Sequence, residues 1–205
     1  MIKLIVKELK EHVPFTFFGA VTGIVLMIFF YRLPYNVSYN IFYVLHPMHV
    51  FFSAFVTASL FEIYNRKKNC RSNIFALILI GYTGSVGIAT LSDSLIPYIG
   101  EVLLNLPNKE AHIGFIEEWW LVNPLAFAGI AAAYFIPRTK MPHAGHVLLS
   151  TWASLFHIIM ASGDQMSWLL YLMVFIFLFL AVWIPCCLSD IIFPLLFVNE
   201  KRHCH

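Results

Sequence analysis

The stretch His46-Pro-Met-His49-Val-Phe-Phe-Ser53 recurs 97 residues later (46 to 143) as His143-Ala-Gly-His146-Val-Leu-Leu-Ser150. At the same offset, Leu91-Ser92-Asp93 recurs as Leu188-Ser189-Asp190. Two polar motifs that stay in register within an apolar chain indicate an internal duplication. The matched residues are imidazoles, carboxylates and hydroxyls, which are costly to place near lipid. We therefore expect the repeated motifs to have a role beyond packing.

The composition is that of a membrane protein. The mean hydropathy is +0.78, and 60% of the residues are hydrophobic while 12% are charged. Soluble domains carry roughly 25% charged residues. A helix that crosses a bilayer needs about 20 apolar residues. The sequence predicts an all-α membrane protein with six transmembrane helices, at 13–31, 41–64, 73–95, 119–137, 145–162 and 168–190.

The basic residues divide unevenly between the two sides of this six-span arrangement. Arg32 and Lys109 fall on one side, and the other side holds Lys3, Lys7, Lys10, Arg66, Lys67, Lys68, Arg71, Arg138, Lys140, Lys201 and Arg202. Cytoplasmic loops of membrane proteins carry an excess of lysine and arginine. We therefore expect a multi-pass protein of the cell membrane with both termini in the cytoplasm. The net charge of +2 reflects this topology and indicates no nucleic-acid partner.

Each copy of the duplication contains three predicted helices. Because three is odd, the second copy enters the membrane in the opposite orientation to the first. A weaker match of Pro14-Phe-Thr-Phe-Phe-Gly19 to Pro124-Leu-Ala-Phe-Ala-Gly129 follows the same order. Inverted repeats are typical of secondary transporters. We predict a single transmembrane domain over 1–205, with repeat 1 at 13–98, repeat 2 at 118–198 and an outer-side connection at about 99–117.

Polar residues recur at helical spacing in the two helices that carry the histidine motifs. Residues three or four apart share one face of a helix. Such a polar face is expected to meet protein or a water-filled pathway, since lipid does not solvate it. The two stripes are His46, His49, Ser53 and Thr57 in the first repeat, and His143, His146, Ser150, Ser154 and His157 in the second.

The predicted topology indicates which motifs can meet. It places His46 and His49 at the level of Asp93, toward the outer face, and His143 and His146 at the level of Asp190, toward the cytoplasm. We predict two related clusters of two histidines and one aspartate, or clusters nearer the midplane if Pro47, Pro97 and Pro194 break their helices. Ser92 and Ser189 precede the two carboxylates and, with Ser53, Thr57, Ser150, Ser154 and His157, are expected to line the pathway.

Two imidazoles one turn apart with a carboxylate are a recurrent ligand set for first-row divalent metals. Three side chains leave the coordination shell of the metal incomplete. An incomplete shell suits a transported ion, which must be released, and it equally suits a hydrolytic metal centre, which needs an open position. A structural interpretation stands beside these, because Asp93 and Asp190 can also cap helices. Cys186 and Cys187 offer soft ligands, but buried cysteines more often pack. No catalytic residue and no organic cofactor are predicted, since no phosphate loop, nucleophile elbow or HExxH occurs.

At these motifs the chain resembles a family of small polytopic membrane proteins of archaea and bacteria, and it is similar to proteins assigned as heavy-metal (manganese) exporters and permeases. The resemblance covers most of the chain and implies metal transport, with no residue roles attached. The residues that carry it are His46–Ser53, Gly84–Ala89 with Leu91–Asp93, and Cys186–Pro194.

The sequence therefore predicts an integral membrane transporter or permease that moves a divalent transition metal ion. Manganese, iron and zinc are compatible with the mixed nitrogen and oxygen ligands. The expected partners are the lipid bilayer and a metal ion or proton, and a homodimer is compatible with the sequence. Two alternatives stay open: an intramembrane metal-dependent enzyme acting on a lipid or quinone, and a non-catalytic scaffold subunit whose polar stripes form only interhelical hydrogen bonds.

Overall fold

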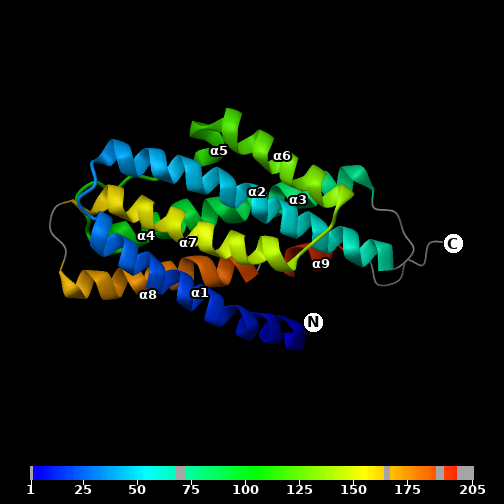
Figure 1. The fold of residues 1–205 in the computed structure, drawn as a ribbon, viewed down its shortest axis with the longest axis horizontal. Coiled ribbons are helices and arrows are strands. Elements are labelled where there is room, and N and C mark those ends of the chain that lie inside the picture. Colours follow the sequence, from blue (N-terminus) through cyan, green and yellow to red (C-terminus); the bar gives the residue numbers. More distant parts are fainter. Residues whose placement is uncertain (1, 68–72, 164–166, 188–191, 198–205) are drawn as a thin grey trace.

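The computed structural model describes residues 2–67, 73–163, 167–187 and 192–197, and every regular element within them is a helix. The prediction of an all-α protein is confirmed. The long helices run along the long axis of one bundle (Figure 1). In chain order the elements are α1 Ile2–Phe30, α2 Tyr35–Lys67, α3 Ile74–Thr90, the π-helix η1 Leu91–Leu95, α4 Ile96–Leu103, α5 Gly114–Glu117, α6 Trp119–Phe135, α7 Lys140–Ser162, α8 Trp168–Cys187 and α9 Phe193–Leu196.

Five stretches of helix are long and apolar enough to cross a membrane: Val13–Phe30, Tyr35–Arg66, Ile74–Leu103, Ala144–Ser162 and Trp168–Cys186. A sixth apolar helix, α6, has 17 residues. The outward faces are apolar, and Phe29, Phe75 and Trp168 expose 75%, 74% and 84% of their surface. Apolar surface on this scale is what lipid covers. These are the features of a multi-pass membrane protein.

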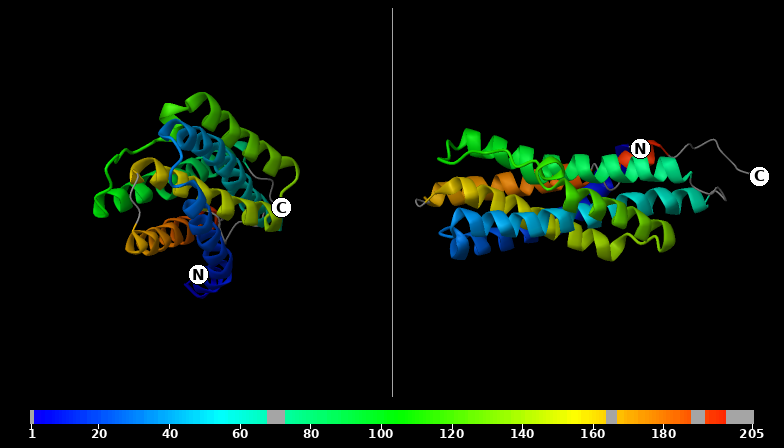
Figure 2. Two further views of the ribbon diagram at one scale, coloured as in Figure 1. Left: turned by 60° about the vertical axis from the view of Figure 1, so that its left-hand side comes forward. Right: turned by 90° about the horizontal axis from the view of Figure 1, so that it is seen from above.

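The two helices with the histidine motifs, α2 and α7, pack against each other in the middle of the bundle. They run in opposite directions (Figure 1). Helix α6 packs on α2 and α3, whereas α1 packs on α7 and α8. Figure 2 shows this order across the bundle, with α6 outside α2 and with α1 and α8 outside α7.

Small residues permit the closest helix contacts. A Cβ atom at Gly129 would lie 2.4 Å from the backbone oxygen of Phe51 and 3.0 Å from the Cβ of Ala54. Only glycine therefore allows α6 to approach α2 this closely, in the manner of small-residue contacts between membrane helices.

Helix α2 runs unbroken through Pro47, whereas the third membrane helix changes register at η1 between α3 and α4. Beyond η1 the helix continues as α4, with Pro97 in its first turn. Of the three proline breaks that the sequence left open, two therefore do not occur in the described residues. Pro194 lies inside the four-residue α9, and the residues before it, 188–191, lie outside the described part.

The two ends of the bundle differ in what closes them. At one end, the Asn108 amide donates to the carbonyl of Ala161 at 3.2 Å, and Tyr35 lies 3.2 Å from His112. We call this the connection end, since the 104–113 segment lies there, at the left of Figure 1. At the opposite end Arg66 donates to the carbonyl of Tyr134 at 2.9 Å, and the Arg138 amide donates to Ser59 at 3.1 Å.

Candidate metal centre

Asp93 lies in the π-helix η1, where one extra residue per turn shifts the backbone hydrogen bonds. The amide of Ile96 donates to the carbonyl of Leu91, five residues earlier. The carbonyl of Ser92 instead accepts a hydrogen bond from Ser154 Oγ on α7 at 2.9 Å. Single π turns of this kind occur often at functional sites. Here the turn gives α7 a direct hydrogen bond to the backbone beside Asp93.

The carboxylate of Asp93 is fully buried and accepts four hydrogen bonds. Its Oδ2 atom lies 2.9 Å from His46 Nδ1 and 2.6 Å from His49 Nδ1. Its Oδ1 atom accepts from Ser92 Oγ at 2.7 Å and from Ser150 Oγ at 2.8 Å. An ionised carboxylate has about four acceptor sites and no donor. Both histidines therefore present Nδ1–H to Asp93, which leaves Nε2 as the nitrogen that can bind a ligand.

These distances are those of hydrogen bonds. Two ligands of one ion with bonds of about 2.0–2.2 Å lie about 3.0–3.5 Å apart. The contact of 2.6 Å between Asp93 and His49 is shorter than that. The geometry thus favours Asp93 as the group that orients the two imidazole rings, as carboxylates do behind metal-bound histidines.

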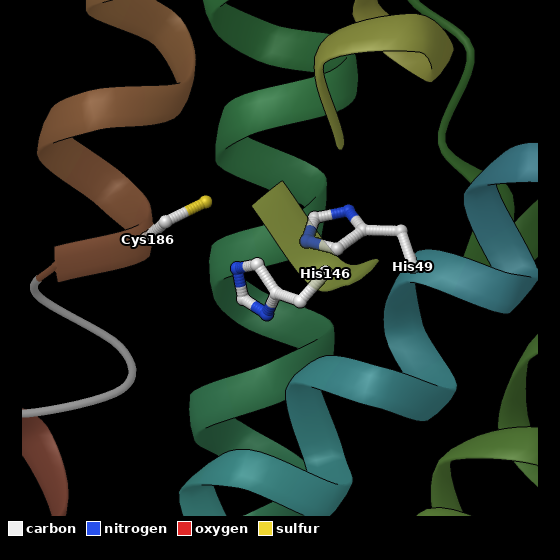
Figure 3. A group of neighbouring side chains, drawn as sticks. All are labelled: His49, His146 and Cys186. Carbon is white, nitrogen blue, oxygen red and sulfur yellow. The ribbon is translucent and has the colours of Figure 1, made fainter. Parts of the chain in front are cut away.

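His49 also belongs to a second group of potential ligands. Its Nε2 atom is buried and has no hydrogen-bond partner among the described residues. The ring of His146 on α7 approaches it edge to face, with the two centroids 4.6 Å apart. Cys186 on α8 completes the group, and one ligand atom from each residue lies within 4.8 Å of the others. Figure 3 shows the three side chains, from α2, α7 and α8, pointing toward one another.

This group, His49, His146 and Cys186, is hereafter the central triad. All three side chains are buried. Ligands of a tetrahedral zinc ion lie about 3.3–3.8 Å apart, so the triad needs only a small contraction to bind one. Imidazole and thiolate together are a common set for zinc, and three protein ligands leave the fourth position open.

The structure brings several predicted residues together. His46, His49 and Asp93 form the predicted first cluster. His146 was expected in a separate cluster with Asp190 but lies beside His49. Ser150 and Ser154 contact Asp93 and the Ser92 carbonyl, while Ser53 and Thr57 are buried on the same face of α2.

Other predicted residues lie elsewhere or outside the described part. His157 binds Glu101 at 2.6 Å, nearer the connection end. Ser189, Asp190 and the side chain of His143 lie outside the described residues. Two residues were not among the predicted site residues. Cys186 offered a soft ligand, but packing is the commoner role of a buried cysteine, and Glu101 falls in the predicted connection at about 99–117. A lone acidic residue within the apolar run 96–103 was the signal for Glu101.

No family model, curated protein or solved structure matches the chain. The resemblance to metal exporters and permeases therefore stays a prediction.

Proposed function

We propose that this protein is a transporter that moves a divalent transition metal ion across a cell membrane, and that the ion binds at the central triad. The observation that carries the proposal is the meeting of His49 and His146. These two residues occupy equivalent positions in the two copies of the motif, and their rings lie 4.6 Å apart. Transporters built from inverted repeats bind substrate near the midplane, where the repeats meet.

The helix contacts support an inverted repeat. If α1, α2 and α3 correspond to α6, α7 and α8, each contact has its counterpart. The packing of α1 on α7 and α8 corresponds to that of α6 on α2 and α3, and the pair α2–α3 corresponds to α7–α8. Helix α6, at 17 residues, spans about 26 Å of a hydrocarbon core about 30 Å thick. Trp119 and Trp120, exposed at its start, suit the membrane interface. On this basis α6 is the sixth span.

The charge distribution supports an orientation in the membrane. Arg66 and Arg138 lie at the opposite end of the bundle from the 104–113 segment. The connection end has Arg32 and Lys109 as its basic residues in the predicted topology. Under the positive-inside rule the connection end faces outward and both termini lie in the cytoplasm.

The ligand set narrows the metals that the sequence allowed. A thiolate with two imidazoles suits zinc or ferrous iron better than manganese, which prefers oxygen ligands. Asp93 holds the ring of His49, and such outer partners strengthen metal binding. The open fourth position suits a cargo ion, because an incomplete shell releases its ion more readily than a closed structural site.

The same open position supports a second candidate, an intramembrane metal-dependent enzyme. A catalytic zinc ion commonly keeps three protein ligands and one water. The two functions differ in one measurable respect. A transporter moves the ion across a sealed membrane, whereas an enzyme keeps it.

Metal binding and flux test the proposal together. Purified protein in detergent should bind Zn²⁺ or Fe²⁺. Loss of a residue that only hydrogen-bonds a metal ligand lowers metal affinity about 10–100-fold. His49→Ala, His146→Ala and Cys186→Ala each remove a ligand and should lower the affinity by more than that. His157→Ala is the matched control, a buried histidine outside the triad, and should bind as the wild type does.

In sealed proteoliposomes with an enclosed metal-sensitive dye, the wild type should accumulate Zn²⁺ and His49→Ala should not. Binding without flux would support the enzyme instead. No binding by the wild type above the level of empty detergent would refute both.

A further inference from the structure

A second polar cluster lies between the central triad and the connection end. Its core is a pair formed by Glu101 of α4 and His157 of α7, with Oε1 and Nδ1 2.6 Å apart. Each side chain exposes 1% or less of its surface. The second carboxylate oxygen of Glu101 has no hydrogen-bond partner among the described residues. This pair belongs to neither group of potential metal ligands.

The hydrogen bonds of His157 define what the pair can do. The backbone amide of His112 donates to Nε2 of His157 at 3.4 Å. The proton of the neutral ring therefore lies on Nδ1, toward Glu101. A buried carboxylate with an oxygen that has no partner among the described residues is costly. The pair thus presents a buried carboxylate and an imidazole that lie apart from both groups of potential metal ligands.

Polar groups connect this pair to the connection end. The rings of His157 and His112 are in edge-to-face contact, with their centroids 5.3 Å apart. His112 Nδ1 lies 3.2 Å from Glu117, and His112 Nε2 lies 3.2 Å from Tyr35. Glu117 exposes 33% of its side chain and Glu110, next to Tyr35, exposes 66%. The path from the buried pair therefore reaches solvent within a few residues.

A polar stripe also connects the pair to Asp93. Ser154 precedes His157 by three residues on α7 and donates to the Ser92 carbonyl. Ser150, one turn further, donates to Asp93. On the α2 side the ring of Phe42 separates His157 from His46, at centroid distances of 5.4 Å and 5.3 Å. The shortest route between the two histidines is therefore closed by an apolar ring in this conformation.

One titratable group contacts the pair and others lie beyond its neighbours. Among the described residues His112 contacts His157. Glu117 and Tyr43 lie behind His112, while His46 and Asp93 lie beyond Phe42. Helix α8 presents the apolar ring of Phe177 to Gly100, beside Glu101.

Metal binding supplies a reason for such a site. Imidazole and thiolate ligands must lose their protons before they bind, so metal binding releases protons. A divalent charge within a membrane is also costly unless other charge leaves or is neutralised. A buried proton acceptor between the metal site and the connection end, with its own route to solvent, meets both needs.

We propose that Glu101 and His157 form a proton-binding site that exchanges protons with the connection end through His112 and Glu117, and that this site couples proton movement to metal movement. The coupling of protons to metal rests on the proposed transport function. The proton-binding site does not depend on that function, so the site and the coupling are tested separately.

The test uses Glu101→Gln and His157→Gln in the full-length protein. The matched control is Glu62→Gln. It changes another buried carboxylate, at the opposite end of the bundle from the connection, where Glu62 pairs with Arg66 at 2.7 Å. Zn²⁺ affinity in detergent should stay within about twofold in every variant, because distant sites are nearly independent. In proteoliposomes with an enclosed pH dye, Zn²⁺-driven proton movement should fall about 100-fold in Glu101→Gln and His157→Gln, the lower range for positioned proton-transfer groups. Glu62→Gln should behave as the wild type.

A second readout requires no metal. Infrared difference spectra between acidic and neutral samples contain carbonyl bands from every carboxyl group that takes up a proton, including exposed ones such as Glu110. The difference between the wild-type and Glu101→Gln spectra should leave one further band, from a buried carboxylic acid, that Glu62→Gln retains. Its presence in Glu101→Gln would overturn the proton site, whatever the protein transports. Zn²⁺ transport by the wild type without proton movement would overturn the coupling and leave the transporter intact. Absence of Zn²⁺ binding would overturn the transporter, while the infrared band would still decide the proton site.

Discussion

His49 and His146 meet edge to face with their ring centroids 4.6 Å apart, where α2 and α7 pack together in the middle of the bundle. The two residues stand at the same position of a motif that occurs twice, 97 residues apart (49 to 146). The Nδ1 atom of His49 lies 2.6 Å from Asp93, and its buried Nε2 atom has no hydrogen-bond partner among the described residues. The contact between His49 and His146 brings the two copies of the motif together.

The first prediction concerns Asp93. Asp93→Asn keeps the shape of the side chain but can no longer accept four hydrogen bonds, so the ring of His49 loses its fixed orientation. Zn²⁺ affinity measured by titration calorimetry should fall by about 10–100-fold. Ser154→Ala, which removes a hydrogen bond to the Ser92 carbonyl but none to the carboxylate, should change affinity much less. Equal losses in both variants would contradict the orienting role.

The second prediction separates the two groups of potential ligands. Co²⁺ bound to a thiolate has an intense near-ultraviolet charge-transfer band that Co²⁺ bound to nitrogen and oxygen lacks. Wild-type protein loaded with Co²⁺ should show this band, and Cys186→Ser should lose it. His46→Ala should keep it, because His46 shares its group with Asp93 and not with the thiol. Co²⁺ binding without this band in the wild type, and loss of that binding in His46→Ala, would instead place the ion at His46, His49 and Asp93.

The third prediction concerns Gly114, which packs against His46. A Cβ atom at this position would lie 2.5 Å from Cδ2 and 2.6 Å from Nε2 of the imidazole. Gly114→Ala should therefore displace His46 and destabilise the protein by about 1–3 kcal/mol, seen as a lower melting temperature in detergent. Gly87→Ala is the control, since its Cβ atom would meet nothing within 4 Å. That variant should be neutral or more stable by up to about 1 kcal/mol.

The fourth prediction is a pH dependence at Glu117, which lies outside the membrane-spanning helices. Burial alone would raise the pKa of this carboxyl group. Hydrogen bonds from Tyr43, the Ile113 amide and His112 outweigh burial and lower the pKa below its ordinary value of 4.5. A lowered carboxyl pKa stabilises the folded connection at pH values above 4.5. That contribution is lost as the pH falls through the lowered value.

Fluorescence of the adjacent Trp119 and Trp120 provides the measurement. The emission should shift on acidification below about pH 4.5 as the contacts of Glu117 are lost. Glu117→Gln should shift much less, because it has no carboxylate to protonate. Glu110→Gln, which alters a carboxylate with 66% of its side chain exposed, should respond as the wild type does. A wild-type-like shift in Glu117→Gln would assign the pH response to another group.

The fifth prediction concerns Phe42, the ring between His157 and His46. Phe42→Leu retains an apolar side chain but leaves space for water between the two imidazoles. Proteoliposomes that contain this variant should leak protons in the absence of metal, as measured with an enclosed pH dye. Phe156→Leu, a change of the same size in the same apolar cluster, should not leak. Comparable leaks in both variants would indicate general loosening of the bundle.

The helices could be predicted well because their signal is local. Long apolar runs such as 168–186 in α8 fold as helices wherever they lie, since backbone groups in lipid must satisfy one another. The stripes of His46, His49 and Ser53 and of His146, Ser150 and Ser154 are likewise set by the period of the helix. The pairing of His46 and His49 with Asp93 followed from topology and is confirmed by the contacts.

The partners of the other site residues could not be predicted, because they depend on how helices pack. Cys186 has no periodic or motif signal that joins it to His49. It reaches the triad because α8 lies against α7. Glu101 became a buried partner of His157 because α4 continues the third membrane helix beyond η1. The π turn η1 adds one residue to a turn of the helix. The spacing of apolar residues in the sequence does not indicate where such an extra residue lies.

By itself the sequence determined the helical membrane fold, the motif that occurs twice and the polar face of each central helix, since these follow from hydropathy and from spacing along the chain. The tertiary structure decided that His146 joins His49 and Cys186. It also decided that Asp93 serves as the anchor of two imidazoles and that His157 turns to Glu101. Those choices depend on distances between helices, which arise only when close contacts such as that of Gly129 with Phe51 bring the helices together.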